Sequence, residues 1–472
     1  MPGAGDLAAD ANPHRGGCGL DEENLLRKGN AVPGGLFTDL YELNMAASYL
    51  RRSMTAAATF SLFVRRLPAN RGFLIAAGLD DCLAFLETFS FADDELAWLR
   101  HTQGYDGQMV EAFRRLRFTG DVWAVPEGTP VFAGEPLLEL TAPIPEAQLA
   151  ETAMLNHVTF QTSIATKAAR CVLAAAGARL VDFSFRRTQG IESGIAAARA
   201  SAIAGFAATS NTEAARRYDL EAAGTMAHSF IEAFDSEAHA FTAFAEDFPG
   251  KTTFLVDTYD TAGGVRAAIE VAARLRLAGP VAVRLDSGDL LEQALLARRL
   301  LDEAGLDQAK IFASGGLDEY AIAGLTAAGA PIDAYGVGTK MGVSADAPYL
   351  DTAYKLTEYD GRPVMKLSAG KVTLPGTKQV HRCPDGDVIC LRDEPLPPGA
   401  RSLLIPVMRR GRRIIPAEPV TAARRRCAEG LAELPPAARD LHAPEPVPVT
   451  ISDALANAQQ TLTRQLRLRS AY

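Results

Sequence analysis

Between Arg179 and Met341 the sequence reads, in part, RLVDFSFRRTQG (179–190), VAVRLDSGD (281–289), KIFASGG (310–316) and DAYGVGTKM (333–341). Each segment joins a short apolar run to a polar or glycine-rich turn, and an amphipathic segment follows. The apolar runs of the whole stretch are Arg179–Phe185, Gly205–Thr209, Ala222–Met226, Thr252–Val256, Val281–Leu285, Lys310–Ala313 and Asp333–Val337. Strand, turn and helix in series predict the βα units of a parallel sheet, closed or nearly closed as a barrel.

The turns after these runs carry arginines, aspartates, one histidine and several glycines. In an α/β barrel the loops after the strands converge on one rim, where the chemistry takes place. The sequence therefore predicts a polar site at the carboxyl ends of the strands.

Segments of β character flank this series on both sides. Gly120–Thr141 has short β runs broken by proline and glycine, and hairpin turns follow the series at Asp360-Gly361, Asp385-Gly386 and Arg410-Gly411. We therefore predict an irregular TIM-like α/β barrel with a second, β-rich domain built discontinuously from N- and C-terminal segments. The predicted parts are a disordered tail (1–34), N-terminal helices with part of the β-rich domain (35–149), the barrel (150–345), and the remaining β-rich part with C-terminal helices (346–472).

Composition narrows the class of protein. A chain of 472 residues is long enough for two domains, and a net charge of −9 argues against a general nucleic-acid binder. The six cysteines are scattered without a CxxC pair, so the sequence predicts neither a metal site nor a disulfide framework. No apolar run reaches membrane-spanning length, and we expect a cytoplasmic protein that binds neither nucleic acid nor membranes.

The first turn of the predicted rim holds aromatic and cationic side chains. Phe183 offers a face to a flat ring, and Arg186 offers a bidentate partner to a carboxylate or phosphate. Adjacent arginines are also common as plain surface charge, but the apolar run before them favours a site.

His228 follows Thr225 in another turn and is predicted to open a helix, His228–Phe248. At a helix N-terminus the dipole lowers the proton affinity of an imidazole and attracts a phosphoryl group. A capping or core histidine is the alternative, and it is favoured for any histidine taken alone.

Arg284 and Asp286 are two residues apart on a predicted strand, so their side chains point to the same side. Arginine suits a pyrophosphate oxygen, and aspartate suits sugar hydroxyls or the shell of a Mg²⁺ ion. The alternative is a helix N-cap with a structural salt bridge. The functional interpretation is favoured because burying charge in a strand is costly without a purpose.

Two glycine-rich turns end the series, Gly315-Gly316 and Gly338-Thr339. Backbone N–H groups in such turns cradle a phosphate, and barrel enzymes often hold one on their last strands. Either turn alone also fits ordinary chain reversal. Together the rim residues predict a site for a flat aromatic ring, a phosphorylated sugar and a polyanionic leaving group.

Seven short motifs lie between about Leu36 and Val380, in the order TDLYELNM, FRRTQG, GTMAHSF, VRLDSGD, ASGGLDE, YGVGTKM and GKVTLPGTKQV. In these motifs the chain resembles the nicotinate phosphoribosyltransferase family, of the type II phosphoribosyltransferase group. The resemblance implies an irregular α/β barrel with a β-rich domain, and a head-to-tail homodimer whose active sites are shared between chains. It implies that nicotinate and 5-phosphoribosyl 1-pyrophosphate (PRPP) give nicotinate mononucleotide and pyrophosphate. It also implies that the reaction belongs to NAD biosynthesis and is coupled to ATP hydrolysis with Mg²⁺.

The resemblance also implies a role for each matched residue. Phe183 stacks on the pyridine ring, and Tyr41 of the partner subunit covers the opposite face. Arg186 takes the nicotinate carboxylate or a nearby phosphate, Arg284 the pyrophosphate and Asp286 the ribose hydroxyls. His228 is phosphorylated from ATP. Thr225 is assigned to substrate binding, and the residues implied to hold the 5-phosphate are Gly315, Gly316, Gly338 and Thr339.

Two serines bear on selectivity. The related nicotinamide enzyme has an aspartate at the position of Ser210, and a neutral side chain spares the nicotinate carboxylate that repulsion. A simple Ser-Asn turn is the alternative. The chain departs from the family's DFGxRR pattern at Ser184, which we expect to crowd the ring pocket.

Other functions stay open at this point. A nicotinamide phosphoribosyltransferase would have the same fold and prefer the amide. A barrel lyase or aldolase would need a Schiff-base lysine inside a strand, and no predicted rim strand has one in a convincing place. A non-catalytic homologue would bind the ring without releasing pyrophosphate.

Overall fold

A parallel sheet forms one half of the computed structural model, which describes residues 34–250, 252–277, 281–368 and 372–469. Its seven strands are paired in the order β8-β7-β6-β12-β11-β10-β9. Their bounds are Arg179–Asp182 (β6), Ala208–Thr209 (β7), Glu221–Ala222 (β8), Thr253–Leu255 (β9), Ala282–Leu285 (β10), Lys310–Ser314 (β11) and Ala334–Val337 (β12). Because β12 pairs with β6, the strands follow one another in circular order, and the ring is open between β8 and β9.

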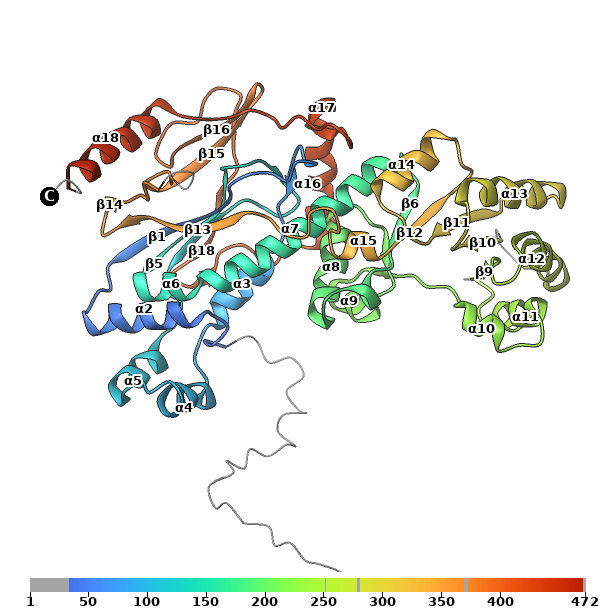
Figure 1. Ribbon diagram of the computed structural model, residues 1–472, viewed down its shortest axis with the longest axis horizontal. Helices are drawn as coiled ribbons and strands as arrows, with labels where there is room; N and C mark the ends of the chain where they lie inside the picture. The colour runs from blue at the N-terminus through green and yellow to red at the C-terminus, as the bar shows by residue number, and fades with distance from the viewer. Residues whose placement is uncertain (1–33, 251, 278–280, 369–371, 470–472) are drawn as a thin grey trace, which may run out of the picture.

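Helices cover the outside of this open barrel (Figure 1). Their bounds are Glu151–Ala174 (α7), Ile191–Ala204 (α8), Thr212–Tyr218 (α9), His228–Glu232 (α10), Glu237–Asp247 (α11), Thr261–Leu275 (α12), Leu290–Glu303 (α13), Glu319–Ala327 (α14) and Thr339–Gly342 (α15). Alternation of strand and helix confirms the predicted TIM-like α/β class, in a curled and incompletely closed form.

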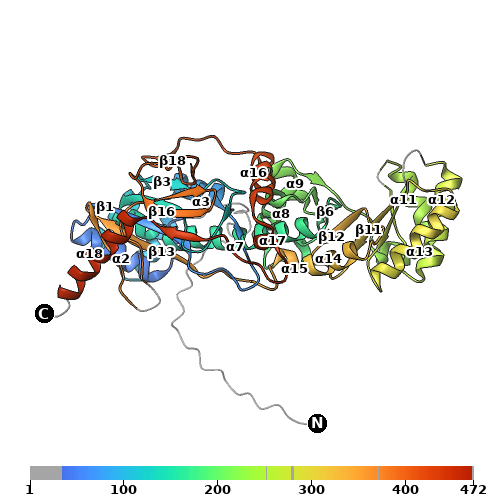
Figure 2. The same ribbon diagram turned by 90° about the horizontal axis from the view of Figure 1, so that it is seen from above.

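The other half of the molecule is rich in antiparallel β structure (Figures 1 and 2). One sheet has the order β14-β13-β1-β5-β3-β18-β19, with strands Ala57–Val64 (β1), Asp121–Ala124 (β3), Pro136–Pro143 (β5), Thr352–Tyr359 (β13), Arg362–Pro363 (β14), Ile405–Arg409 (β18) and Arg412–Arg413 (β19). A second sheet has the order β17-β15-β16-β20, with strands Lys378–Cys383 (β15), Gly386–Leu391 (β16), Arg401–Ser402 (β17) and Val449–Ile451 (β20). A third sheet pairs Leu74–Ile75 (β2) with Pro130–Val131 (β4). C-terminal strands therefore flank three central N-terminal strands on both sides of one sheet, as predicted for a discontinuous β-rich domain.

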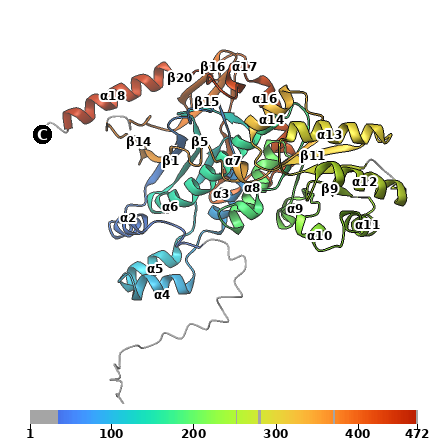
Figure 3. The same ribbon diagram turned by 45° about the vertical axis from the view of Figure 1, so that its right-hand side comes forward.

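The remaining helices are Leu40–Arg51 (α2), Leu79–Thr88 (α3), Asp93–His101 (α4), Gly107–Arg115 (α5), Ile144–Leu149 (α6), Val420–Glu433 (α16), Pro436–Arg439 (α17) and Asp453–Arg469 (α18). In Figure 3, α18 extends away from the body of the molecule, and α4 and α5 lie together below it. Although α16 belongs to the C-terminal segment, its Ala423 and Cys427 are buried in the barrel's core. The exact domain boundaries stay a prediction, and all of the predicted tail except Gly34 lies outside the described residues.

Two predicted elements differ from the structure. Of the run Ala222–Met226 only Ala222 lies in a strand, the two-residue β8, because the alanines and glycine of the run offer little apolar surface and only its Met226 is buried. The predicted helix His228–Phe248 is split into α10 and α11, since Ser236 caps a new helix by accepting from His239 N at 3.2 Å. None of the described helices combines the length and apolarity that a membrane crossing needs.

A buried pair of carboxyl groups joins the N- and C-terminal contributions to the β-rich half. Glu135, directly before β5, is fully buried, and its Oε2 accepts from Phe132 N at 2.8 Å. Asp387 of β16 is held by Arg382 at 2.6 Å. Burial and the neighbouring Asp387 raise the pKa of Glu135 well above its ordinary value. Glu135 therefore keeps its proton at pH values at which an exposed glutamate is ionised.

This pair makes stability depend on pH. Above the ordinary glutamate pKa the unfolded chain releases a proton that folded Glu135 keeps, so stability falls by about 1.4 kcal/mol for each pH unit until the raised pKa is reached. Glu135→Gln has nearly the same shape and is neutral at every pH, as the protonated glutamate is. We expect its melting temperature to exceed that of the unchanged protein at pH 8 and to match it at pH 5. Glu246→Gln, on an exposed position of α11, is the control. Equal destabilisation of Glu135→Gln at both pH values would contradict the raised pKa of Glu135.

Candidate active site

The carboxyl ends of β6, β10, β11 and β12 meet at one edge of the parallel sheet. The pairing of β6 with β12 continues one residue past the end of β6, since Phe183 N donates to Val337 O at 2.9 Å. A Cβ atom on Gly336 would lie 2.7 Å from Phe183 Cδ2, so the absence of a side chain there makes room for the ring. Gly338 follows at the same place, and a Cβ on it would lie 3.2 Å from Phe183 O. The ring and the second glycine turn are thus direct neighbours.

Arg284 is the centre of this edge. Its side chain is nearly buried, and its guanidinium carbon lies 5.3 Å from the centre of the Phe183 ring. Its Nε donates to Ser314 Oγ at 2.8 Å, and its terminal nitrogens donate to Thr225 Oγ1 at 2.9 Å and Asp286 Oδ1 at 2.7 Å. The guanidinium group is therefore held rigidly by three different segments of the chain.

Asp286 is fixed in its ionised form. Burial alone would raise its pKa, but hydrogen bonds from Ser314 and Arg284 outweigh that effect, so the pKa lies below its ordinary value. A Cβ on Gly315 would collide with Asp286 O, so the first glycine turn packs directly against this residue. Gly315 also has φ +92, a conformation that favours glycine.

His228 faces the same group from the open side of the barrel. Its Nδ1 lies 3.1 Å from Thr258 Oγ1, and its Nε2 lies 3.9 Å from Asp286 Oδ2, beyond hydrogen-bond distance. The histidine is partly exposed and begins the five-residue helix α10. So short a helix gives little of the dipole effect predicted from the sequence, and the neighbouring side chains fix the ring instead.

Asp257 also belongs to this group, although the sequence did not single it out. Its Oδ2 accepts from Asp286 N at 2.7 Å and from Ser287 Oγ at 2.6 Å. Its Oδ1 is buried and has no hydrogen-bond partner among the described residues. The only sequence signal was the motif DTYDT after the run Thr252–Val256, which resembles ordinary turn chemistry. We call Phe183, Thr225, His228, Asp257, Arg284 and Asp286 the strand-end cluster.

The other predicted residues lie around this cluster or away from it. Exposed residues on the neighbouring turns are Arg186, Ser210, Gly315, Gly316 and Thr339. Ser210 N donates to Asp182 O at 2.8 Å, which fixes its turn beside β6. Ser184 is fully buried with its side chain against Gly342, so it does not line the exposed part of the site.

Tyr41 lies on α2, which Figures 1 and 2 place at the opposite end of the molecule from α10 to α13. A single chain therefore does not bring Tyr41 to Phe183. The tyrosine is 49% exposed, beside the exposed Phe37 and Leu40, so its ring is accessible to another molecule. Its assignment to a shared site stays a prediction.

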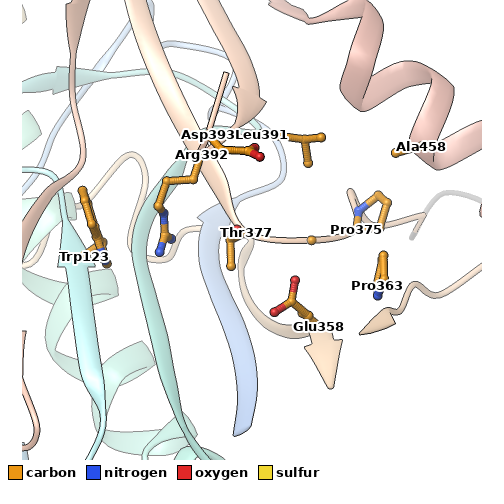
Figure 4. A pocket seen from close by; sticks show the side chains of 10 residues that line it. Trp123, Glu358, Pro363, Pro375, Thr377, Leu391, Arg392, Asp393 and Ala458 are labelled. Carbon is orange, nitrogen blue, oxygen red and sulfur yellow. The ribbon is translucent and has the colours of Figure 1, made fainter. Parts of the chain in front are cut away.

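A cavity of about 550 Å³ lies elsewhere, in the β-rich half (Figure 4). Its walls include Trp123 of β3, Glu358 of β13 and Arg392 after β16. Arg392 lies 4.7 Å from the Trp123 ring and is paired with the buried Glu139, so it already has a structural partner. The cavity contains none of the predicted site residues.

The fold and the site together define an α/β-barrel protein with a rigid arginine–aspartate pair, a histidine and glycine turns suited to anionic ligands. Comparison with known families agrees with this class. The nicotinate phosphoribosyltransferase N-terminal domain model matches residues 36–159, and the C-terminal domain model matches 397–459. The quinolinate phosphoribosyl transferase C-terminal domain model matches residues 164–353.

The chain is 48% identical over 430 residues to nicotinate phosphoribosyltransferase pncB2 of Mycobacterium tuberculosis, covering 89% of this chain and 92% of the relative. It is 43% identical over 378 residues to the nicotinate phosphoribosyltransferase of Bacillus subtilis, covering 76% of each. The human nicotinic acid phosphoribosyltransferase structure superposes with a TM-score of 0.80 at 29% identity, over 90% of this chain and 99% of that one. A nicotinate-nucleotide pyrophosphorylase from Pyrococcus furiosus gives a TM-score of 0.70 at 26% identity, over 84% and 95%. The chain belongs to the nicotinate phosphoribosyltransferase family.

The rigid fork of Arg284 predicts a binding preference that is measurable directly. Arg284→Lys keeps the charge but loses the paired donors, and hydrogen bonds between charged groups contribute roughly 1.5–3 kcal/mol. We expect the affinity for inorganic pyrophosphate with Mg²⁺, measured by titration calorimetry, to fall about tenfold or more. Arg299→Lys, on an exposed position of α13, should leave the affinity unchanged. Equal pyrophosphate affinities of the unsubstituted protein, Arg284→Lys and Arg299→Lys would show that Arg284 does not bind the anion.

Proposed function

We propose that this chain transfers the phosphoribosyl group of PRPP to the ring nitrogen of nicotinate, giving nicotinate mononucleotide and pyrophosphate for NAD biosynthesis. The observation that carries the proposal is the strand-end cluster, in a chain of this family. An aromatic face, a fixed arginine, an ionised aspartate and a histidine meet there beside two glycine turns. We further propose that the reaction is ATP-coupled, in the manner of a ligase, and takes place in the cytoplasm.

The chemistry of the transfer explains why these side chains suffice. The bond between C1 of the ribose and the pyrophosphate oxygen weakens while the ring nitrogen attacks, so positive charge builds on the sugar and negative charge on the leaving group. The pyridine nitrogen already carries a lone pair and needs no base. Arg284 stabilises the departing pyrophosphate, and the ionised Asp286 accepts from the ribose hydroxyls. Phe183 stacks on the pyridine ring beside the guanidinium.

The remaining assignments concern the edges of the site. Arg186 takes the nicotinate carboxylate or a nearby phosphate, and Thr225 contributes to substrate binding. The 5-phosphate is held at the two exposed glycine turns by Gly315, Gly316, Gly338 and Thr339. Two copies of the chain form a homodimer with shared sites, in which Tyr41 of the partner subunit covers the pyridine.

Mg²⁺ fits the two aspartates of the strand-end cluster. The described residues include no group of three or more His, Cys, Asp or Glu side chains arranged to hold a metal by themselves. Mg²⁺ in phosphate-handling sites usually takes one or two carboxylates and completes its shell with water and substrate oxygens. Asp286, with Asp257 and its unpartnered Oδ1, supplies such a set. When bound, the ion would neutralise part of the pyrophosphate charge.

His228 is the proposed site of phosphorylation by ATP. Its Nδ1 is engaged by Thr258, so Nε2 is the nitrogen that faces the pyrophosphate site and Asp286. A phosphoryl group there adds negative charge next to Asp286 and changes the affinity of the site for pyrophosphate. This links ATP hydrolysis to product release by differential binding.

The decisive assay follows labelled nicotinate with PRPP and Mg²⁺, with and without ATP. Formation of nicotinate mononucleotide with equal release of pyrophosphate is the expected result. Preference for nicotinamide would instead support the nicotinamide phosphoribosyltransferase, and ring binding without pyrophosphate release would support a non-catalytic homologue.

His228→Ala should remove the stimulation by ATP, because no other imidazole lies in the strand-end cluster as described. The measurement is the ratio of the transfer rate with ATP to the rate without it, which should fall to unity. His239→Ala, on an exposed position of α11, is the matched control and should keep the ratio. Persistent ATP stimulation in His228→Ala would show that the phosphoryl group is carried elsewhere.

Ser210→Asp tests selectivity between the acid and the amide. A carboxylate at this exposed position repels the carboxylate of nicotinate and accepts a hydrogen bond from the amide of nicotinamide. We expect kcat/KM for nicotinate to fall about tenfold, with nicotinamide affected less or improved. Ser210→Asn, which is neutral, is the control. An unchanged ratio of kcat/KM for the two rings would make Ser210 a simple turn residue.

A further inference from the structure

Five charged side chains form a buried network between α7 and the segments that follow β11 and β12. Lys167 Nζ lies 2.5 Å from Glu319 Oε2 and 2.7 Å from Asp346 Oδ1. Arg170 Nε lies 2.8 Å from the other oxygen of Glu319, and Arg71 lies 2.9 Å from Asp346. The lysine, both arginines and Glu319 are essentially inaccessible to solvent. We call this set the α7 charge network.

Two carboxylates of the network, Glu319 and Asp346, belong to the segments that follow the two glycine turns. Glu319 is the first residue of α14 and lies three positions after Gly316. Asp346 lies four positions after Gly342, the end of the short helix α15 that begins at Thr339. Lys167 Nζ therefore contacts one carboxylate anchored next to each turn. Figures 1 and 2 show α7, α14 and α15 lying together in both views.

A second ion pair joins the turns on their exposed side. Lys340, directly after Thr339, lies 2.9 Å from Asp318, which also caps α14 by accepting from Ala321 N at 2.9 Å. The two turns are thus linked at the surface through Lys340 and in the interior through Lys167. Only the interior link is protected from solvent screening, since Lys340 is 46% exposed.

We infer that Lys167 is a positioning residue: by bridging Glu319 and Asp346 it fixes the distance between the Gly315-Gly316 and Gly338-Thr339 turns, and so shapes the cradle for the 5-phosphate of PRPP. This inference rests on the proposed function, which assigns the phosphate to those turns. Lys167 does not touch the substrate and acts only through the backbone of the two turns.

The charge arrangement favours this role over a purely stabilising one. Burying a salt bridge costs desolvation that its attraction only partly recovers, and an apolar pair of similar volume is often as stable. Each carboxylate in the network has a second cation, since Arg170 holds Glu319 and Arg71 holds Asp346. The lysine is therefore not needed to neutralise either one. Its distinctive property is that one ammonium group contacts both.

Lys167→Met tests the inference because it breaks the bridge while each carboxylate keeps a partner. A displacement of the cradle should raise the KM for PRPP about tenfold, since small misplacements of binding groups are costly. The KM for nicotinate should stay unchanged. Asp346→Asn, at a partly exposed position, cuts the other arm of the bridge and should raise the KM for PRPP in the same direction but less. The KM of Asp346→Asn for PRPP tests the inference independently if Lys167→Met folds poorly.

The matched control is Lys378→Met in the β-rich half. Lys378 is equally buried, lies 3.0 Å from the buried Glu139, and leaves that carboxylate paired with Arg392 when removed. It should lower the melting temperature to a similar extent without changing the KM for PRPP. An unchanged KM for PRPP in Lys167→Met, or an equal rise in Lys378→Met, overturns the inference alone. An unsubstituted protein that makes no nicotinate mononucleotide overturns the proposed function and the inference with it.

Discussion

The pairing of β6 with β12 is the constraint on which the site depends. These strands are the first and last of the parallel series, and their register sets Val337 opposite Asp182. Without that contact Phe183 and Gly338 would lie at opposite ends of an open sheet. The pairing is possible at this closeness because Gly336 has no side chain to displace the Phe183 ring. A contact between residues far apart in the sequence thus places the Phe183 ring beside Arg284.

The helix α7 connects the barrel to the β-rich half of the molecule. Its first turns bury Met154 and Val158 in the core of the β-rich half, and its later turns bury Ile164 and Ala168 in the core of the barrel. One rigid element is therefore part of both cores. A change in how the halves pack would move the barrel's last turns, because the same helix carries Lys167.

The sequence predicted the strands better than the connections between them. Apolar β-branched runs such as Val281–Leu285 bury enough surface to fix a strand, and β10 is found there. The run Ala222–Met226 has the same length but small side chains, so tertiary contacts decided its conformation. Asp257 was missed because its role comes from accepting from Asp286 N, a contact between the turns after β9 and β10 that the local sequence pattern does not encode. Arg284 and Asp286 could be predicted from the sequence because charge at the end of a buried strand is rare without a purpose.

The gap between β8 and β9 gives the histidine a different kind of support from the other site residues. Phe183, Arg284 and Asp286 stand at or just beyond the ends of paired strands, so the sheet itself holds them. His228 follows the irregular stretch from Ala223 to Ala227, which crosses the open side of the barrel. That stretch is tied to the sheet where Arg284 donates to Thr225 Oγ1 at 2.9 Å and Met226 O at 3.4 Å. The same guanidinium that would bind a leaving pyrophosphate therefore also holds the segment carrying the histidine. An anion that draws Arg284 away from Thr225 would loosen His228, so occupancy of the anion site and the position of the imidazole are physically coupled.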